Sequence, residues 1–150
     1  MAFKYKFKTS QSQIKQVHAK YMGHVRDAII SRLEYVGWEF VKMAREGGGY
    51  NDVTGNLRSS IGFVVVDRGR IVNENFDNKG KGFVGVKKAK KLTKELASKY
   101  SNGYTLIVVA GMEYAAAVEN KGKDVITGSS LIAETMLNQA MAKLKKKSIG

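Results

Sequence analysis

The stretch Tyr50–Val66, YNDVTGNLRSSIGFVVV, constrains the fold of this chain more than any other part of the sequence. It follows the triple glycine 47–49, which ends a long helical pattern, and it runs from turn residues through a short helix-like segment into apolar β sequence. Hydrophobic period is the main sequence signal of secondary structure, so a change of period marks a change of element. We therefore predict that the chain passes here from a layer of helix into a layer of sheet.

The segment before this stretch has apolar residues at helical spacing from Ser12 to about Ala44, and it predicts a long helix over residues 12–46. Such a helix would be a rod on the order of 50 Å, unless it breaks near Gly23 or Gly37. A small sheet cannot cover a rod of that length. We therefore expect part of its apolar stripe to contact another helix or another subunit.

The whole pattern indicates one α+β domain over residues 1–150, in which long N-terminal and C-terminal helices pack on a small sheet. We expect a mixed or antiparallel sheet of about 3–5 strands. Its most apolar segment, Tyr104–Ala110, is the predicted central strand. Around it, the sequence predicts a core at 50–126 with further strands at 62–67, 70–75 and 124–126, a helix at 87–100, and a C-terminal helix at 129–146.

Both later helices have a predicted apolar face. In the first, Ala89, Leu92, Leu96 and Tyr100 share one face and lysines occupy the rest, whereas the glycine-rich segment 76–86 before it predicts a loop. The residues expected to be buried on the C-terminal helix are Ile132, Met136, Leu137, Ala140 and Leu144.

Residues 1–11 are predicted to be an extended arm. Phe3, Tyr5 and Phe7 alternate with lysines, and this period of two is typical of a strand with one apolar and one cationic face. Two interpretations remain open. The arm either becomes ordered on a neighbouring subunit, since terminal segments often need a partner to hold them, or forms an edge strand of its own sheet.

Charge is the strongest global feature, because 26 Lys and Arg stand against 13 Asp and Glu for a net charge of +13. This excess favours an anionic partner, either nucleic acid or an acidic protein surface, although a basic solvated face has the same composition. Clustered lysines bind DNA through counterion release, without reading its sequence. The candidate contacts to DNA or to an acidic partner are Lys79, Lys81, Lys87, Lys88, Lys90, Lys91, Lys145, Lys146 and Lys147.

The search for catalytic, metal and membrane features favours a protein that is not an enzyme. The chain has no cysteine, and no apolar run approaches the roughly 20 residues that span a bilayer. His18 and His24 fall on different faces of the first helix and are poor joint metal ligands. Ser59 and Ser60 lack the G-x-S-x-G context of a hydrolase. We therefore expect no catalytic residue, cofactor, metal site or membrane partner.

Two segments resemble elements of a known family. Residues 50–61 (YNDVTGNLRSSI) resemble the D-x-T-G-x-L-R-x-S-I element of minor virion proteins of tailed phages, the head–tail connector or tail-completion (neck) proteins of the lambda-like type. Residues 112–122 (MEYAAAVENKG) are similar to that family's x-Y-A-x-x-V-E-x-G element, which follows a central apolar strand. The order of predicted elements also fits over residues 12–145.

The resemblance implies a non-enzymatic structural protein of the virion neck or tail, assembled in the host cytoplasm. It would form a homo-oligomeric ring of six or twelve copies between the portal and the tail. Portal or adaptor proteins and tail proteins would be its neighbours, and packaged DNA could touch its basic residues without sequence specificity. The alternative is a small basic DNA-binding protein of a phage or mobile element.

The first of these elements has a simple physical interpretation. Thr54 or Asp52 can cap a short helical turn, and Gly55 permits close approach of another backbone. Leu57 and Ile61 are predicted to point inward. The stretch would then clamp the long helix to the sheet.

We also predict that Arg58 pairs with Glu119, because the two elements carry opposite charges and would meet beside the sheet. This pairing would connect both elements in one structural motif. The residues assigned to that motif are Thr54, Gly55, Leu57, Arg58, Ile61, Tyr114, Glu119 and Gly122.

Overall fold

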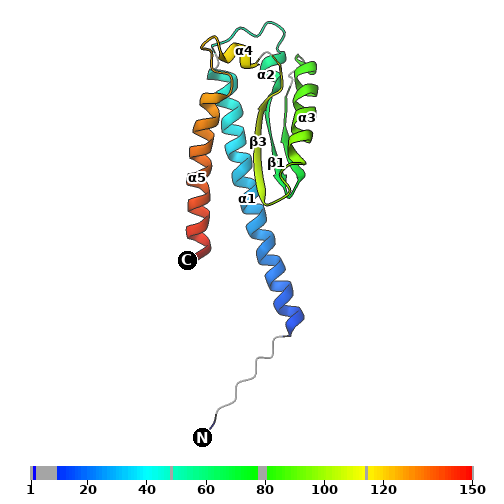
Figure 1. Cartoon of the computed structure of the whole chain (residues 1–150). Coiled ribbons are helices and arrows are strands. Elements are labelled where there is room, and N and C mark those ends of the chain that lie inside the picture. Colours follow the sequence, from blue (N-terminus) through cyan, green and yellow to red (C-terminus); the bar gives the residue numbers. More distant parts are fainter. Residues whose placement is uncertain (1, 3–9, 48, 78–80, 114, 150) are drawn as a thin grey trace.

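The predicted α+β fold is confirmed: a long N-terminal helix and a C-terminal helix accompany a three-stranded antiparallel sheet. Figure 1 shows the layers in the order α5 (Thr127–Ile149), α1 (Gln11–Gly47), sheet, and α3 (Phe83–Ala97). Two short helices, α2 (Asn56–Ser60) and α4 (Ala115–Glu119), lie at one end of these layers. The computed structural model describes residues 2, 10–47, 49–77, 81–113 and 115–149.

The helix α1 is continuous for 37 residues, through both Gly23 and Gly37, and is therefore about 55 Å long. Only its C-terminal half has buried residues, from Leu33 to Ala44. Apolar residues of α5, including Ala133, pack against this half and join the same core cluster. The predicted contact of the stripe with another helix is thus confirmed, although α5 leaves the first turns of α1 uncovered (Figure 1).

The sheet has the order β2–β1–β3, built from β1 (Ile61–Asp67), β2 (Arg70–Asn75) and β3 (Tyr104–Ala110). The prediction that residues 104–110 form the central strand is wrong, because β1 is central and β3 is an edge. Every residue of β1 is buried, since α1 and α3 cover its two faces and a strand pairs with it on each side. The apolar composition of β3 reflects cover on its faces rather than a second neighbouring strand.

The predicted position of α3 is corrected, and its predicted apolar face is confirmed at Ala89 and Leu96 but wrong at Leu92 and Tyr100. The helix begins at Phe83, inside the predicted loop, and ends at Ala97 rather than at residue 100. Small residues every fourth position are buried, whereas Leu92 and Tyr100 are 37% and 46% exposed. The cause is close packing, because a Cβ atom added at Gly111 would lie only 2.5 Å from Ala89 Cα. The buried stripe consists of Gly85, Ala89, Thr93 and Ala97.

Other predictions have mixed outcomes. Residues 124–126 are not a strand, and α5 begins directly after them at Thr127. Ile132 is 51% exposed rather than buried, because Ala133 occupies the contact with the core. The arm over residues 3–9 lies outside the described residues, as do two further predicted site residues, Lys79 and Tyr114.

Candidate interaction surfaces

The stretch after α1 holds α2 through its polar side chains. The Asp52 carboxylate accepts hydrogen bonds from the backbone N–H groups of Leu57 (3.4 Å) and Arg58 (2.7 Å), and therefore caps α2. Thr54 Oγ1 accepts a bond from the N–H of Asn56 at 3.3 Å, so both predicted capping residues contribute. Leu57 is 2% exposed and lies in the core that includes α1, as predicted.

The predicted pairing of Arg58 with Glu119 is not formed. The Arg58 guanidinium lies over the ring of Tyr50, with 5.4 Å from its carbon to the ring centroid. The Tyr50 hydroxyl donates to the carbonyl of Ala44, near the end of α1, at 3.2 Å. This cation–π contact therefore connects α2 to the end of α1 and leaves Glu119 to other partners.

Glu119 instead organises the turn that leads into α5. Its Oε1 atom accepts backbone hydrogen bonds from Val125 (3.2 Å), Ile126 (2.8 Å) and Thr127 (2.9 Å), and a fourth bond from the Thr127 hydroxyl at 3.0 Å. These donors, foremost the N–H of Ile126, lower the pKa of Glu119 and outweigh the opposing effect of burial. The carboxylate thus accepts hydrogen bonds from N–H groups at the start of α5 that have no partner within the helix. Gly122, in the same turn, has φ +76°.

Gly55 and the residues around it pack against the N-terminal end of α3. Gly55 is left-handed, with φ +71°, and a Cβ atom there would lie 3.2 Å from Lys81 Cβ, so the predicted close approach is confirmed. Asn56 Oδ1 accepts a bond from the N–H of Gly85 at 3.3 Å, and the Ser59 hydroxyl donates to the Lys81 carbonyl at 3.0 Å. The turn residues of this stretch therefore pack α2 against α3.

Two arginines that sequence reasoning missed anchor α1 to the sheet. Near one end of β1, Arg45 donates to the carbonyl of Ile61 at 2.9 Å, and burial lowers the pKa of its guanidinium. At the other end of β1, Arg26 Nε lies 2.9 Å from Asp67 Oδ2, while Arg68 binds the second carboxylate oxygen. Arg68 and Arg26 together lower the pKa of Asp67. The contacts of Arg45 with Ile61 and of Arg26 with Asp67 join residues far apart in sequence, so no local sequence pattern predicts them.

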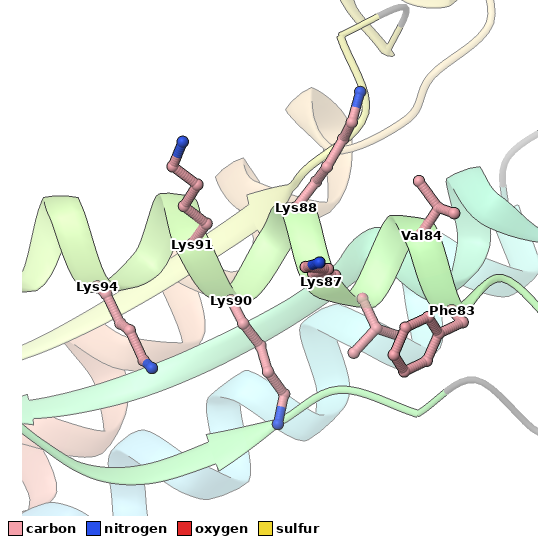
Figure 2. A pocket seen from close by; sticks show the side chains of 8 residues that line it. Phe83, Val84, Lys87, Lys88, Lys90, Lys91 and Lys94 are labelled. Carbon is pink, nitrogen blue, oxygen red and sulfur yellow. The ribbon is translucent and has the colours of Figure 1, made fainter.

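The solvent side of α3 carries the largest group of lysines. A shallow concavity of about 880 Å³ runs along this side between lysines and the exposed Phe83 and Val84. Figure 2 shows that the side chains fan out, with Lys88 and Lys91 on one side of the helix and Lys90 on the other. They spread over a surface and do not converge on one point. This geometry suits an extended anionic surface better than a small anion.

The predicted lysine contacts do not form one surface. Lys88 binds Glu113 at 2.9 Å and Lys90 binds Glu74 across to β2. Exposed lysines remain at the outer side of α3, of which Lys87 and Lys91 have no ion pair among the described residues. The second group, Lys145, Lys146 and Lys147, lies at the end of α5, on the opposite side of α1 and the sheet (Figure 1).

The N-terminal half of α1 exposes part of its apolar stripe. Ile14, Val17 and Tyr21 are 57%, 70% and 53% exposed and continue the stripe that is buried farther along the helix. The stripe leads into a groove of about 400 Å³ between α1 and α5, which includes Val25 and Met141. Contiguous exposed apolar residues of this kind mark surfaces that bind other proteins.

Chemistry-bearing side chains do not gather elsewhere in the described part of the chain. Within residues 10–47, 49–77, 81–113 and 115–149, no three His, Cys, Asp or Glu side chains lie close enough to hold a metal ion. His18 and His24 are both exposed on α1. None of the described helices combines the length and the apolar character needed to cross a membrane.

Comparisons with known proteins identify no relative. A scan against protein-family models found no matching family, and searches of curated proteins and of solved structures found no match. The resemblance to phage neck proteins therefore rests on residues 50–61 and 112–122 and on the order of the elements.

Proposed function

We propose that this chain is a structural protein of a tailed-phage virion, part of the neck between portal and tail. The observation that carries the proposal is the uncovered first turns of α1, where Ile14 and Val17 extend the apolar stripe of the helix into solvent. A protein whose work is adhesion needs such a surface. The resemblance of residues 50–61 and 112–122 to neck-protein elements supports the same role.

In this role the protein forms a homo-oligomeric ring of six or twelve copies and contacts portal or adaptor proteins and tail proteins. Closure of a ring requires two different, complementary surfaces on each subunit. The exposed half of α1 supplies one surface. The lysine-bearing side of α3 and the end of α5 would face acidic partners or the packaged DNA.

Electron microscopy of the purified chain, with gold labelling of virions that carry it, tests this role. We expect ring-shaped class averages and label at the junction of head and tail. A chain that stays monomeric at every concentration, together with virions that carry no label, would contradict the proposal. Rings without label at the junction would place an assembling protein outside the neck and would also contradict it.

The second candidate is a small basic DNA-binding protein of a phage or mobile element, favoured by the lysines on the outer side of α3. Such binding would release counterions, so affinity would fall steeply with salt. Fluorescence anisotropy with duplex DNA at increasing salt separates the candidates. If the monomer binds duplex DNA at moderate salt and the double variant Lys87→Glu/Lys91→Glu does not, the result would favour DNA binding over the virion role.

A further inference from the structure

The outer edge of β3 carries backbone groups without hydrogen-bond partners among the described residues. The ladder with β1 is flanked by the bonds Gly111 N–Ser60 O (3.1 Å) and Arg68 N–Gly103 O (2.8 Å). Because antiparallel pairing alternates, the odd-numbered residues of β3 face β1 and the even-numbered residues direct N–H and C=O outward. The outward residues are Tyr104, Leu106, Val108 and Ala110.

The opposite edge of the sheet is protected, whereas the edge at β3 is not. The pairing of β2 with β1 has an irregular register between Val65 and Val66, and β2 carries Arg70 and the ion-paired Glu74. Bulges and charges are the usual means by which an edge strand avoids pairing with other chains. The sequence of β3, YTLIVVA, has neither charge nor proline, and its register with β1 is regular.

The apolar side chains of β3 are also unequally covered. Ile107 and Val109, on the side of α3, are 8% and 4% exposed. Leu106 and Val108, on the side of α1, are only partly buried and pack at the margin of the main core. An added strand with one apolar face would therefore gain most by placing that face on the side of α1.

The sequence contains a segment of matching pattern at residues 3–9, FKYKFKT. These residues lie outside the described structure. Their alternation of aromatic residues with lysine is that of a strand with one apolar and one charged face. An extended segment that adds to an open sheet edge gains main-chain hydrogen bonds and fills side-chain sites at alternate positions.

Chain length decides which copy of the molecule can supply this segment. The Arg26–Asp67 pair fixes α1 at the end of the sheet where Asp67 pairs with Tyr104. From Arg26 the helix runs away from the sheet toward Ser10 (Figure 1), a distance of about 24 Å. Seven extended residues span at most about 25 Å. The segment is therefore just long enough to reach Tyr104 of its own copy, and no residues would remain to pair with its own β3.

We propose that residues 3–9 of one copy bind as a fourth strand to β3 of a neighbouring copy. Phe3, Tyr5 and Phe7 then cover Leu106 and Val108, and the lysines face the opposite side. Donor and acceptor are different surfaces, so the contact is heterologous and each copy can both donate and accept. The inference concerns self-assembly and does not depend on a place in a virion.

Sedimentation velocity of the full chain and three variants tests the proposal. Deletion of residues 2–9 removes the donor, and Val108→Pro removes an outward N–H without disturbing the ladder with β1. Glu74→Pro is the matched control, because its N–H points outward from the opposite edge. We expect the deletion and Val108→Pro to weaken association at least about tenfold with unchanged far-UV circular dichroism, and the control to associate like the natural chain. Association that survives the deletion, or a monomeric full chain, overturns the proposal.

Disulfide cross-linking provides a second test that does not depend on proline variants, since the natural chain has no cysteine. Chains carrying Tyr5→Cys are mixed with chains carrying Leu106→Cys or Val108→Cys, and Lys6→Cys serves as control. Side chains of neighbouring residues in a strand point to opposite faces, so cross-links from position 5 should exceed those from position 6 several-fold. Equal yields, or dominant links between two copies of β3, contradict the proposal.

Discussion

Gly37 is the residue whose absence of a side chain matters most to the packing of α1. A Cβ atom at this position would lie 2.5 Å from Cδ2 of the Phe63 ring, and the neighbouring Trp38 meets the same ring edge-on with 6.0 Å between centroids. Glycine normally weakens the interior of a helix relative to alanine. Here it lets α1 approach the centre of the sheet, and this packing accounts for its place in the helix.

Gly37→Ala should therefore destabilise the protein by about 1–3 kcal/mol, because the added methyl group displaces the Phe63 ring. Gly23→Ala is the matched control in the same helix. Nothing lies within 4 Å of a Cβ atom there, so alanine should stabilise by about 0.5–1 kcal/mol. Urea unfolding measures both changes, and equal shifts of the same sign would refute the packing argument.

The negative charge of Glu119 should stabilise the start of α5. Glu119→Gln removes the charge beside the first turn of α5 and should lower stability at pH 7 by about 0.5–1 kcal/mol. The folded pKa lies below the ordinary value of 4.5, so the contribution of Glu119 is present above pH 4.5 and is lost as the pH falls through the folded pKa. Thermal unfolding from pH 7 down to pH 3 should show the difference between variant and natural chain shrink. A constant difference would show that the charge is not the cause.

Among the elements, α1 combines a structural half and an exposed half. Residues from Leu33 to Ala44 form the core with β1 and α5, whereas Ile14 and Val17 lie on turns that no described element covers, and Tyr21 lies at the edge of the groove with α5. Burial of a large apolar side chain stabilises by about 1.5–3 kcal/mol, and the exposed half obtains none of that inside one copy. The proposed contact with another subunit would bury these side chains.

The double variant Ile14→Ser/Val17→Ser should consequently leave the free energy of unfolding of the monomer within about 0.5 kcal/mol of the natural value. The same variant should weaken self-association, which sedimentation measures. Phe40→Ala, at a fully buried position of the same helix, should cost about 3–5 kcal/mol of stability. A large loss of monomer stability in the serine variant would place the stripe in the core and not at an interface.

Across the whole molecule, the basic charge is divided between two sides. The lysines of α3 and those at the end of α5 are separated by α1 and the sheet (Figure 1). At physiological salt, charges separated by more than about 8 Å of solvent are largely screened. Each group therefore acts as its own patch, and one straight polyanion cannot contact both patches of a copy at once.

Charge reversal tests this division on a heparin column. Lys87→Glu/Lys91→Glu and Lys145→Glu/Lys147→Glu should each lower the salt concentration of elution. If the patches act independently, the quadruple variant should lower the salt concentration of elution by about the sum of the two decreases. Loss of all retention in either double variant would instead indicate one continuous binding surface.

Much of the fold follows from local pattern. The strands at 61–67, 70–75 and 104–110 have the predicted positions within one residue, and the two long helices are present with wider bounds. The turn chemistry at Asp52 and Thr54 was also predictable, because caps act over a few residues. Periodicity identifies an element from its own residues, and these elements are regular enough to need no other information.

The errors share a physical cause. The composition of β3 shows that its faces are covered but contains nothing about which strands lie beside it. On α3, hydrophobicity selected Leu92 and Tyr100 beside the correctly predicted Ala89 and Leu96, whereas the close approach of helix and sheet buries the small residues Gly85 and Thr93. Arg58 contacts the aromatic ring of Tyr50, and Glu119 accepts hydrogen bonds from backbone N–H groups a few residues along the chain.

The amino-acid order thus specifies the elements, the apolar stripe of α1 and the basic charge, since each depends on residues close along the chain. Other features depend on which distant segments come into contact. They are the strand order, the close packing of α3 on the sheet, the position of the two lysine groups on opposite sides and the unpaired edge of β3. These contacts are determined by how the layers pack together, and the sequence of a single segment carries no information about that packing.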